Sequence, residues 1–438
     1  MSDFKDIARK ALETAKKLGA QNAAASIARS QDLDITWRKG KIENMSSAGA
    51  SGLSISLYVD GRYGSYGISD LRPESIDAFI KKAIDMTRLL EEDPARTLPD
   101  PERYKNRADV DLELYDDAVA GVTPNKLVEM CGALEAECQK RTAIPVTDIS
   151  VEYGTQLSES YSVNTNGFEG ERKKSYLAGS CELTMTDGDK KPSNYGYSQA
   201  RFLADLRSAQ QIADEAEHYC KLVLGQKKLP SKNRTLILDP RVSSQMVSKF
   251  IKPLYTSSLV MKKSYFQDKI GESFASALFD LHDMPFIKRG LSSSLFDGEG
   301  MSYQDATIFD AGVLKQYYLS TYGANKLGLT ATHGSNTNLV LTPGKRSRDE
   351  IIADVEDGIY VISLLGGNMD EVRGDFSHGI IGVAIENGKL TTPVSEMNIS
   401  GNHLEFWKNL AEVGNDPRIE SSTRVPSLRI DNVATSGS

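Results

Sequence analysis

Hydrophobic and polar residues follow two periods along this chain, and the periods recur in the same order. Five segments carry apolar residues three or four positions apart, which is typical of helices that pack through one face. They are residues 3–18, 73–91, 123–141, 207–223 and 242–252. Between them, apolar and polar residues alternate with a period of two, which predicts strands. The predicted strands lie near 22–30, 31–38, 41–47 and 51–59, and again near 145–153, 158–165, 168–177 and 179–186.

Turn residues repeat with the same spacing as these elements. Gly40, Gly52, Asp60 and Gly61 reappear 127 positions later as Gly167, Gly179, Asp187 and Gly188. An Asp-Gly pair between alternating segments favours a type I′ hairpin, because glycine tolerates a positive φ. The first half is therefore predicted to be a duplicated α-β-β-β-β-α unit, with copies at about 1–92 and 123–223. The Pro-rich stretch 91–104 connects them.

The second half has a different pattern. An apolar strand at 236–238 runs into the helix at 242–252, and short strands with glycine turns follow, including an Asn387-Gly388 hairpin. Only 319–327 and 403–412 also have a helical pattern there. The predicted fold class is α+β, with an N-terminal α/β domain (1–225) that contains the repeat and a β-rich C-terminal domain (226–438).

Composition narrows the functional classes. The 438 residues carry 52 basic and 60 acidic side chains, a net charge of −8, which argues against direct nucleic-acid binding. The N-terminal segment is an amphipathic helix of mixed charge and not a signal peptide, and no apolar run approaches the ~20 residues of a membrane span. The four cysteines form no CxxC pair, which favours a reduced, cytoplasmic protein.

Two clusters of polar residues are candidates for chemistry. Asp297 and Glu299 lie two apart in a glycine-rich loop, where two carboxylates could bind a cation or act as acid and base, although a tight polar turn is the favoured interpretation. Ser377 and His378, close to Asp375, are the residue types of a catalytic triad. Neighbours in a strand point to opposite faces, however, so this pair is not expected to converge. The five histidines include no HExxH motif, and nucleotide-binding loops are absent from the sequence.

An ordered set of short motifs resembles the TldD/PmbA family along nearly the whole chain. The motifs are "FDGEG" (296–300), "DFSHGIIGVAIENGKLTTPV" (375–394), "ISGN" (399–402), "VGND" (413–416) and "VPSLRIDNV" (425–433). The resemblance implies duplicated N-terminal units followed by a β-rich C-terminal domain. It also implies one of two branches, because TldD-like chains are zinc metallopeptidases whereas PmbA chains, also called TldE, are their partners.

The metallopeptidase signature of the family is degenerate in this sequence. TldD-like chains carry His-Glu-x-x-x-His on the helix that corresponds to 242–252, and a cysteine near the C-terminus completes their metal site. Here Gln245, Met246 and Phe250 stand at the three helix positions, and the C-terminal segment has no cysteine. Methionine and phenylalanine cannot act as a general base, and glutamine is a poor zinc ligand. The resemblance therefore implies neither catalytic residues nor bound zinc in this chain, with zinc expected in a TldD-like partner.

The expected function is that of a PmbA/TldE-like non-catalytic subunit of a TldD–TldE metallopeptidase that cleaves unfolded peptides. Such a subunit would form a heterodimer with the TldD-like chain and close a proteolytic chamber. In the absence of that partner, the chain could also form a homodimer. Helix 242–252, loop 297–300 and segment 374–380 are expected to face the chamber or the partner, with Asp297, Glu299, Ser377 and His378 as candidate residues. Two alternatives remain, a regulatory protein of the kind named modulator of DNA gyrase, and an independent hydrolase with an unrecognised site. No membrane contact is expected.

Overall fold

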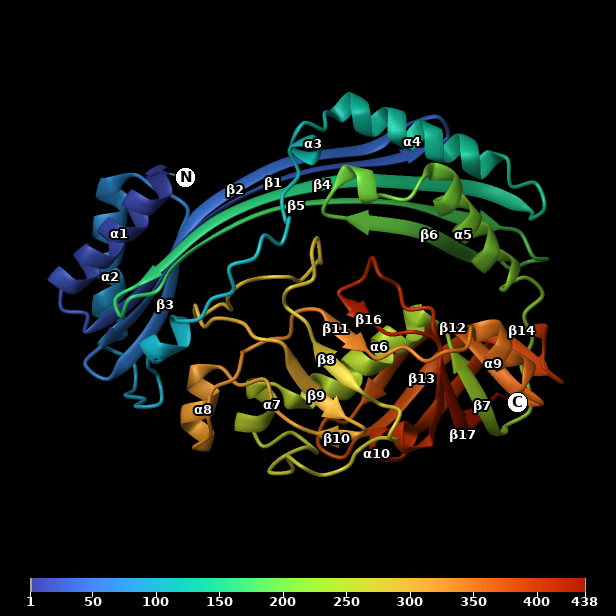
Figure 1. Ribbon diagram of the computed structural model, residues 1–438. Helices are drawn as coiled ribbons and strands as arrows, with labels where there is room; N and C mark the ends of the chain where they lie inside the picture. Colours follow the sequence, from blue (N-terminus) through green and yellow to red (C-terminus); the bar gives the residue numbers. More distant parts are fainter. Residues whose placement is uncertain (1, 438) are drawn as a thin grey trace.

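A large antiparallel sheet dominates the first half of the computed structural model, which describes residues 2–437 (Figure 1). Its strand order is β3-β2-β1-β4-β5-β6, so the two copies of the repeat join through their first strands, β1 and β4. The strands are β1 (Asn22–Arg38), β2 (Lys41–Val59), β3 (Arg62–Ile68), β4 (Val146–Asn164), β5 (Glu169–Met185) and β6 (Ser193–Ala200). The sheet arches over the C-terminal half of the chain.

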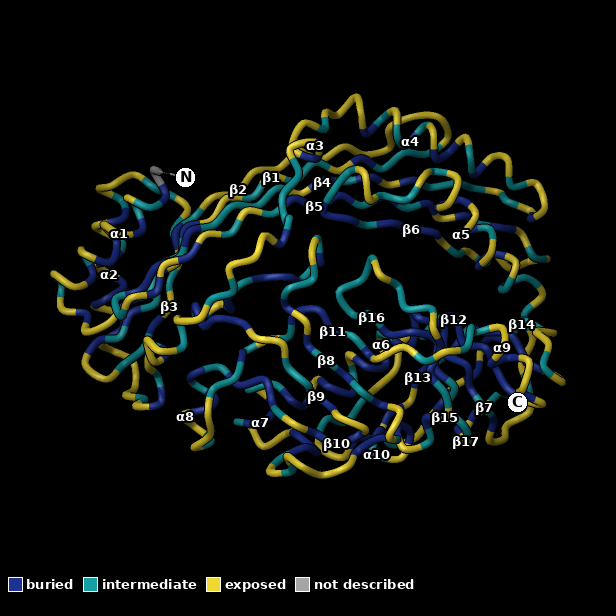
Figure 2. Tube along the Cα trace, in the orientation of Figure 1, coloured by how far each residue is buried: buried dark blue, intermediate teal, exposed yellow. Residues whose placement is uncertain are grey.

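The helices of the repeat cover one face of this sheet because every second strand residue there is apolar. Helices α1 (Ser2–Lys17) and α2 (Pro73–Thr87) bury Ile27 and Leu53 at one end. Helices α4 (Pro124–Gln139) and α5 (Ala209–Lys221) bury Val151 and Leu183 at the other. Figure 2 shows the buried stripes under these helices. The four predicted helices are thus confirmed to within a few residues at their ends.

Each copy of the repeat contains three strands, which corrects the prediction of four. The predicted pairs of strands merge into single long strands, because Ser47, Gly49 and their neighbours stay extended and keep pairing with β1 (Gly49 opposite Gln31). The third strand of each copy, β3 or β6, was missed. The Asp60-Gly61 turn joins β2 to β3 with φ values of 50° and 75°, as a type I′ hairpin requires.

The C-terminal half contains two further sheets, with strand orders β14-β13-β12-β7-β17-β15 and β10-β9-β8-β11-β16. The first is built from β7 (Lys232–Leu238), β12 (Asp357–Met369), β13 (Asp375–Glu386), β14 (Lys389–Asn402), β15 (Leu410–Val413) and β17 (Leu428–Ser436). The second is built from β8 (Leu281–Asp283), β9 (Ala306–Asp310), β10 (Val313–Leu314), β11 (Leu339–Leu341) and β16 (Thr423–Arg424). The predicted Asn387-Gly388 hairpin joins β13 to β14. The α+β fold class and the β-rich second half are confirmed.

The helices of this half are short except for α6 (Pro240–Ile251), which follows β7. The others are α7 (Thr256–Val260), α8 (Thr321–Leu327), α9 (Arg348–Ala353) and α10 (His403–Phe406), and α3 (Asp117–Ala120) lies between the repeats. The prediction of a helix over 403–412 is wrong beyond its first turns, since Leu410 and Val413 pair with β17 as a strand. Within residues 2–437, no helix combines the length and the apolar character that crossing a membrane requires.

Candidate functional site

The face of the large sheet that is turned away from its helices, called the inner face below, is polar. Cross-strand rows combine residues of β1, β4 and β5, for example Asp32, Gln156 and Tyr176. Two residues further along the strands, on the same face, a second row contains Ser30, Ser158 and Lys174. Small hydroxyl-bearing side chains alternate here with a few charges, so the inner face presents hydrogen-bonding groups over a long, accessible surface.

Three cavities follow the inner face. A cavity of about 420 Å³ is lined by Asp34 and Glu152, among others, and one of about 570 Å³ by Ser158 and Lys174. The third, of about 430 Å³, lies where the sheet meets loop 297–300 and includes Glu299 in its lining. The inner face is therefore hollowed over most of its length.

The C-terminal half is fastened to β5 beside these cavities. The Arg172 guanidinium donates to the carbonyl oxygens of Phe296 and Asp297 at 2.8 and 2.7 Å. The Lys174 ammonium donates to the carbonyl of Ser293 at 3.1 Å, and burial, together with the nearby Arg201 charge, lowers its pKa to about 8. Basic side chains of the sheet thus hold segment 293–297 by its main chain.

The two candidate carboxylates of loop 297–300 have separate partners. Asp297 is buried, and its Oδ1 accepts from the backbone N–H groups of Glu299 and Met301 at 2.9 Å. Its Oδ2 lies 3.9 Å from His333 Nδ1. Glu299 Oε2 accepts from the Thr321 N–H at 2.8 Å, at the start of α8, and burial raises the Glu299 pKa. Asp297 therefore shapes its own loop, whereas Glu299 borders a cavity.

Ser377 and His378 point to opposite faces of β13, as strand alternation requires. Ser377 is exposed, whereas His378 is buried and its Nδ1 lies 3.1 Å from the carbonyl oxygen of Gly366. Its ring stacks on Phe376, and burial lowers its pKa. Among the described residues that line the three cavities, neither member of this pair occurs. The structure does not bring them together with Asp297 or Glu299.

Helix α6 begins at Pro240, and Asp239 separates it from the end of β7. Asp239 Oδ1 caps the helix by accepting from the Arg241 N–H at 2.9 Å, and proline suits the first helical position. Of the degenerate motif positions, Gln245 is exposed, whereas Met246 and Phe250 have no accessible surface. Helical periodicity puts the last two on the core-facing side.

Phe250 lies at the centre of an aromatic cluster. Its ring centroid is 5.2 Å from that of Trp407, 5.3 Å from Phe309 and 5.6 Å from Phe279. Such side chains offer zinc no donor atom, and the residues of α6 therefore do not fit a zinc site. Within residues 2–437, no group of three or more His, Cys, Asp or Glu side chains is placed to hold a metal ion.

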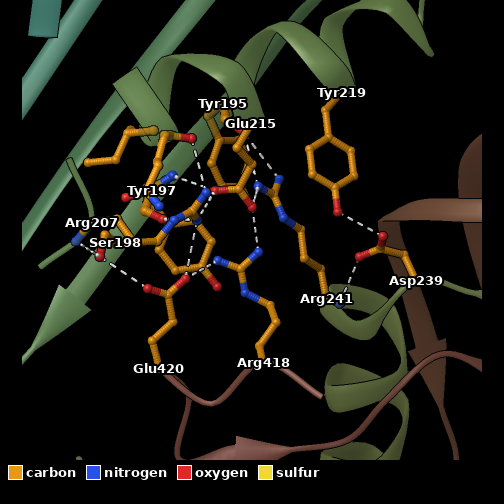
Figure 3. Close-up of polar contacts among 12 residues, drawn as sticks. Tyr195, Tyr197, Ser198, Arg207, Glu215, Tyr219, Asp239, Arg241, Arg418 and Glu420 are labelled. Carbon is orange, nitrogen blue, oxygen red and sulfur yellow. Dashed lines mark hydrogen bonds and ion pairs between the residues drawn. The ribbon is translucent and has the colours of Figure 1, made fainter. Parts of the chain in front are cut away.

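A buried ion cluster joins α5, α6 and the C-terminal segment (Figure 3). Glu215 of α5 accepts from Arg241 of α6 at 2.6 Å, from Arg418 at 2.5 Å and from Arg207 at 2.7 Å. Arg418 and Arg207 also contact Glu420, at 2.6 and 3.4 Å. Burial pushes the Glu215 pKa upward, but the charges of Arg241 and Arg418 outweigh it and lower the pKa to about 2.

The same junction contains a second buried carboxylate, the helix cap Asp239. Its Oδ2 accepts from the Tyr219 hydroxyl at 2.7 Å and from the Tyr360 hydroxyl. The ion cluster and this carboxylate fix the start of α6 against the sheet and its helices. Sequence reasoning missed both, because residues 215, 241 and 418 are far apart in the chain and each resembles an ordinary surface charge.

Comparisons with known proteins identify the same family that the motifs resemble. Models of three domains of this family match the chain in order. They are PmbA/TldA metallopeptidase domain 1 over residues 23–87, the central domain over 117–219 and the C-terminal domain over 231–437. A crystal structure of a candidate modulator of DNA gyrase from Bacteroides thetaiotaomicron is 38% identical, covers 99% of both chains and superimposes with a TM-score of 0.94. The chain belongs to the PmbA/TldD family.

Two further relatives are similar over nearly the whole chain. Metalloprotease PmbA of Escherichia coli O157:H7 is 26% identical over 98% of this chain and 96% of its own length. The crystal structure of TldE from Thermococcus kodakarensis covers 98% of this chain and 100% of its own, with a TM-score of 0.88 and 20% identity, which shows a shared fold. The resemblance drawn from the motifs is confirmed.

Proposed function

We propose that this chain is the non-catalytic, PmbA/TldE-type subunit of a two-chain metallopeptidase that cleaves unfolded peptides. The observation that carries the proposal is the state of α6, where two of the three motif positions are packed in the core and the third is an exposed glutamine. A TldD-like partner would supply the zinc and the general base. This chain would contribute a wall of the chamber and a surface for the substrate.

The inner face of the sheet suits the binding of an extended peptide. Rows of serine, glutamine and carboxylate groups can hydrogen-bond to main-chain amides without selecting a side-chain sequence. The cavities along this face could accept peptide side chains of either charge. The cavity lined by Asp34 and Glu152 suits a basic side chain, and the one lined by Lys174 suits an acidic side chain. A peptidase that cleaves unfolded chains must bind peptides of many different sequences.

The proposal is tested by purifying the chain alone and together with a TldD-like chain that carries His-Glu-x-x-x-His. Alone, the protein should contain no stoichiometric zinc by elemental analysis and should leave an unfolded peptide uncut. With the partner, cleavage should appear and a chelator should abolish it. Cleavage by the chain alone that survives a chelator would contradict the proposal and favour an independent hydrolase.

Affinity purification from native cells distinguishes the remaining alternative. We expect the protein to recover a chain with the complete zinc motif. A relative of this chain is named for DNA gyrase, so gyrase recovered in place of a TldD-like chain would instead support a regulatory role.

A further inference from the structure

The cavity beside loop 297–300 contains a carboxylate oxygen that no other group of the described chain uses. Glu299 is half-buried, and its Oε2 accepts from the N–H and the hydroxyl of Thr321 at 2.8 and 3.2 Å. Within residues 2–437, Oε1 has neither a hydrogen bond nor an ion pair, and it keeps some accessible surface. One oxygen of the Glu299 carboxylate is therefore available to a ligand.

Two guanidinium groups near Glu299 have other partners. Arg172, which also lines the cavity, donates to main-chain carbonyl oxygens of segment 293–297. Arg96 lies between two tyrosine rings, at 4.7 and 3.6 Å from their centres. Neither guanidinium forms an ion pair with Glu299, so the carboxylate can still attract the positive charge of a ligand.

The rest of the lining offers hydrogen-bond acceptors and aromatic faces. The Oγ atoms of Ser26 and Ser162 lie 2.8 Å apart on the inner face. Ser56 Oγ lies 3.3 Å from the Tyr63 hydroxyl, and the Tyr63 ring is 5.1 Å from that of Tyr58, centre to centre. A primary ammonium group has three N–H donors and is attracted to the faces of aromatic rings. The lining therefore suits such a group.

This cavity is the first of three that follow one another along β1. Residues 24–26 line it, residues 28–30 line the cavity that includes Lys174, and Asp32 and Asp34 line the next. Strand residues rise about 3.4 Å each, so an extended peptide would pass from one cavity to the next after about four residues.

The connector between the repeats forms a wall at this end of the series. Leu98 and Pro99 line the cavity, and the Pro99 carbonyl oxygen accepts from Asn166 Nδ2 at 2.6 Å, in the turn after β4. The Ala95 carbonyl oxygen accepts from Asn325 Nδ2 at 2.9 Å, which holds the connector to α8. The wall is thus fixed on both sides, and the cavity is suited to the end of a peptide.

We propose that this cavity binds a primary ammonium group of the substrate peptide, with Glu299 Oε1 as its counter-ion and the neighbouring hydroxyl groups as further acceptors. The inference rests on the proposed function, because it assigns one part of the peptide-binding face. The connector wall favours the α-ammonium group of the peptide's N-terminus over a lysine side chain. A peptide bound in this way would run along β1, past the cavity lined by Lys174 and then past Asp34.

Binding of three unfolded peptides to the full chain alone tests the assignment. The first peptide has a free N-terminus and no lysine, the second is its N-acetylated form, and the third is acetylated but has a lysine at its second position. Acetylation should weaken binding about tenfold, the effect of losing a charge-assisted hydrogen bond, in fluorescence anisotropy with a label at the C-terminus. The third peptide should bind as weakly as the second. If it binds as tightly as the first, the ammonium site stands and its ligand is the lysine side chain.

Glu299→Gln is the matched variant, since its amide oxygen can still accept from Thr321. It should bind the first peptide about as weakly as the wild type binds the acetylated one, and acetylation should have no further effect. Glu129→Gln, on the exposed surface of α4 beyond the other face of the sheet, should bind all three peptides like the wild type.

Equal binding of the free and the acetylated peptide by the wild type, or a Glu299→Gln variant that still distinguishes them, would overturn the inference. Either result would leave the proposed function standing, because zinc content and cleavage with the partner test that function separately. A wild-type chain that binds none of the three peptides would contradict both the ammonium site and the peptide-binding face on which it rests.

Discussion

Glu215 shows how much a single buried charge determines in this molecule. Its carboxylate is the shared partner of Arg241, Arg418 and Arg207, and the side chains of Glu215 and Arg241 are nearly inaccessible. Glu215→Gln keeps the shape but removes the charge, which leaves Arg241 buried with only the Tyr195 carbonyl oxygen as a further acceptor. We expect this variant to lose about 3–5 kcal/mol of unfolding free energy, the usual cost of breaking a buried ion pair. Urea unfolding measures the loss.

An exposed ion pair provides the matched control. Glu405 contacts Lys408 at 3.2 Å on the surface of α10 and the following turn, and Glu405→Gln should change the stability by less than about 1 kcal/mol. Equal losses for the two variants would contradict the role given to the buried cluster.

The pH dependence of stability should also reveal Glu215. Its pKa of about 2 in the folded state lies below the ~4.3 of an unfolded glutamate, so its stabilising contribution is present above about pH 4.3 and is lost as the pH falls through 2. This difference between the folded and unfolded pKa corresponds to about 3 kcal/mol of unfolding free energy. Unfolding free energies measured between pH 5 and 2 should therefore fall more steeply for the wild type than for Glu215→Gln. Parallel pH profiles would argue against this assignment.

At the scale of elements, α6 buries Met246 and Phe250 in the core, at two of the three positions where the resemblance implies zinc ligands and a general base in TldD-like chains. We predict that a variant with Gln245→His, Met246→Glu and Phe250→His binds no stoichiometric zinc and is strongly destabilised. Removing the Phe250 ring from its cluster costs about 3–5 kcal/mol, and a buried carboxylate at 246 adds to the loss. Elemental analysis and thermal unfolding test both parts of the prediction.

The single substitution Gln245→His is the control for this variant, because position 245 is exposed. It should change stability by no more than about 0.5 kcal/mol. A triple variant that is as stable as the wild type and binds one zinc ion per chain would contradict the prediction, because α6 could then still present metal ligands.

Local patterns predicted the elements well where one physical signal dominates. The amphipathic helices were found to within a few residues, and Asp60-Gly61 and Asn387-Gly388 form the expected hairpins. Strand lengths were wrong because the small residues between Ser47 and Ser51 interrupt the alternating pattern, whereas Gly49 continues the β2–β1 pairing opposite Gln31. The segment after Phe406 was misjudged because its pairing with β17 is a tertiary interaction.

The site was less predictable than the elements. Motif spacing located α6 and loop 297–300, and strand alternation separated Ser377 from His378 as expected. The polar inner face depends on the register of β1, β4 and β5, and the Glu215 cluster depends on contacts between distant segments. Neither the register nor such contacts can be read from residues near one another in the chain.

At the scale of the whole molecule, a shared hydrophobic cluster binds the large sheet to the C-terminal half. The cluster combines Val151 and Leu177 of the large sheet with Ile237, Tyr360 and Ile385 of β7, β12 and β13. Burial of these side chains therefore requires both halves. With the ion cluster at the same junction, this packing predicts that the chain unfolds in one cooperative transition.

Truncation tests this coupling. A fragment of residues 226–438 would expose Ile237, Tyr360 and Ile385, which have no accessible surface in the full chain. Each large apolar side chain that loses its burial costs about 1.5–3 kcal/mol, so three of them amount to a large part of the stability of an ordinary domain. We expect the fragment to bind a hydrophobic dye and to melt at a lower temperature than the full chain. Calorimetry of the full chain should give a single transition. A fragment that melts at the temperature of the full chain and binds no dye would show instead that the two halves are stable independently, with the sheet free to move as a cover over the C-terminal half.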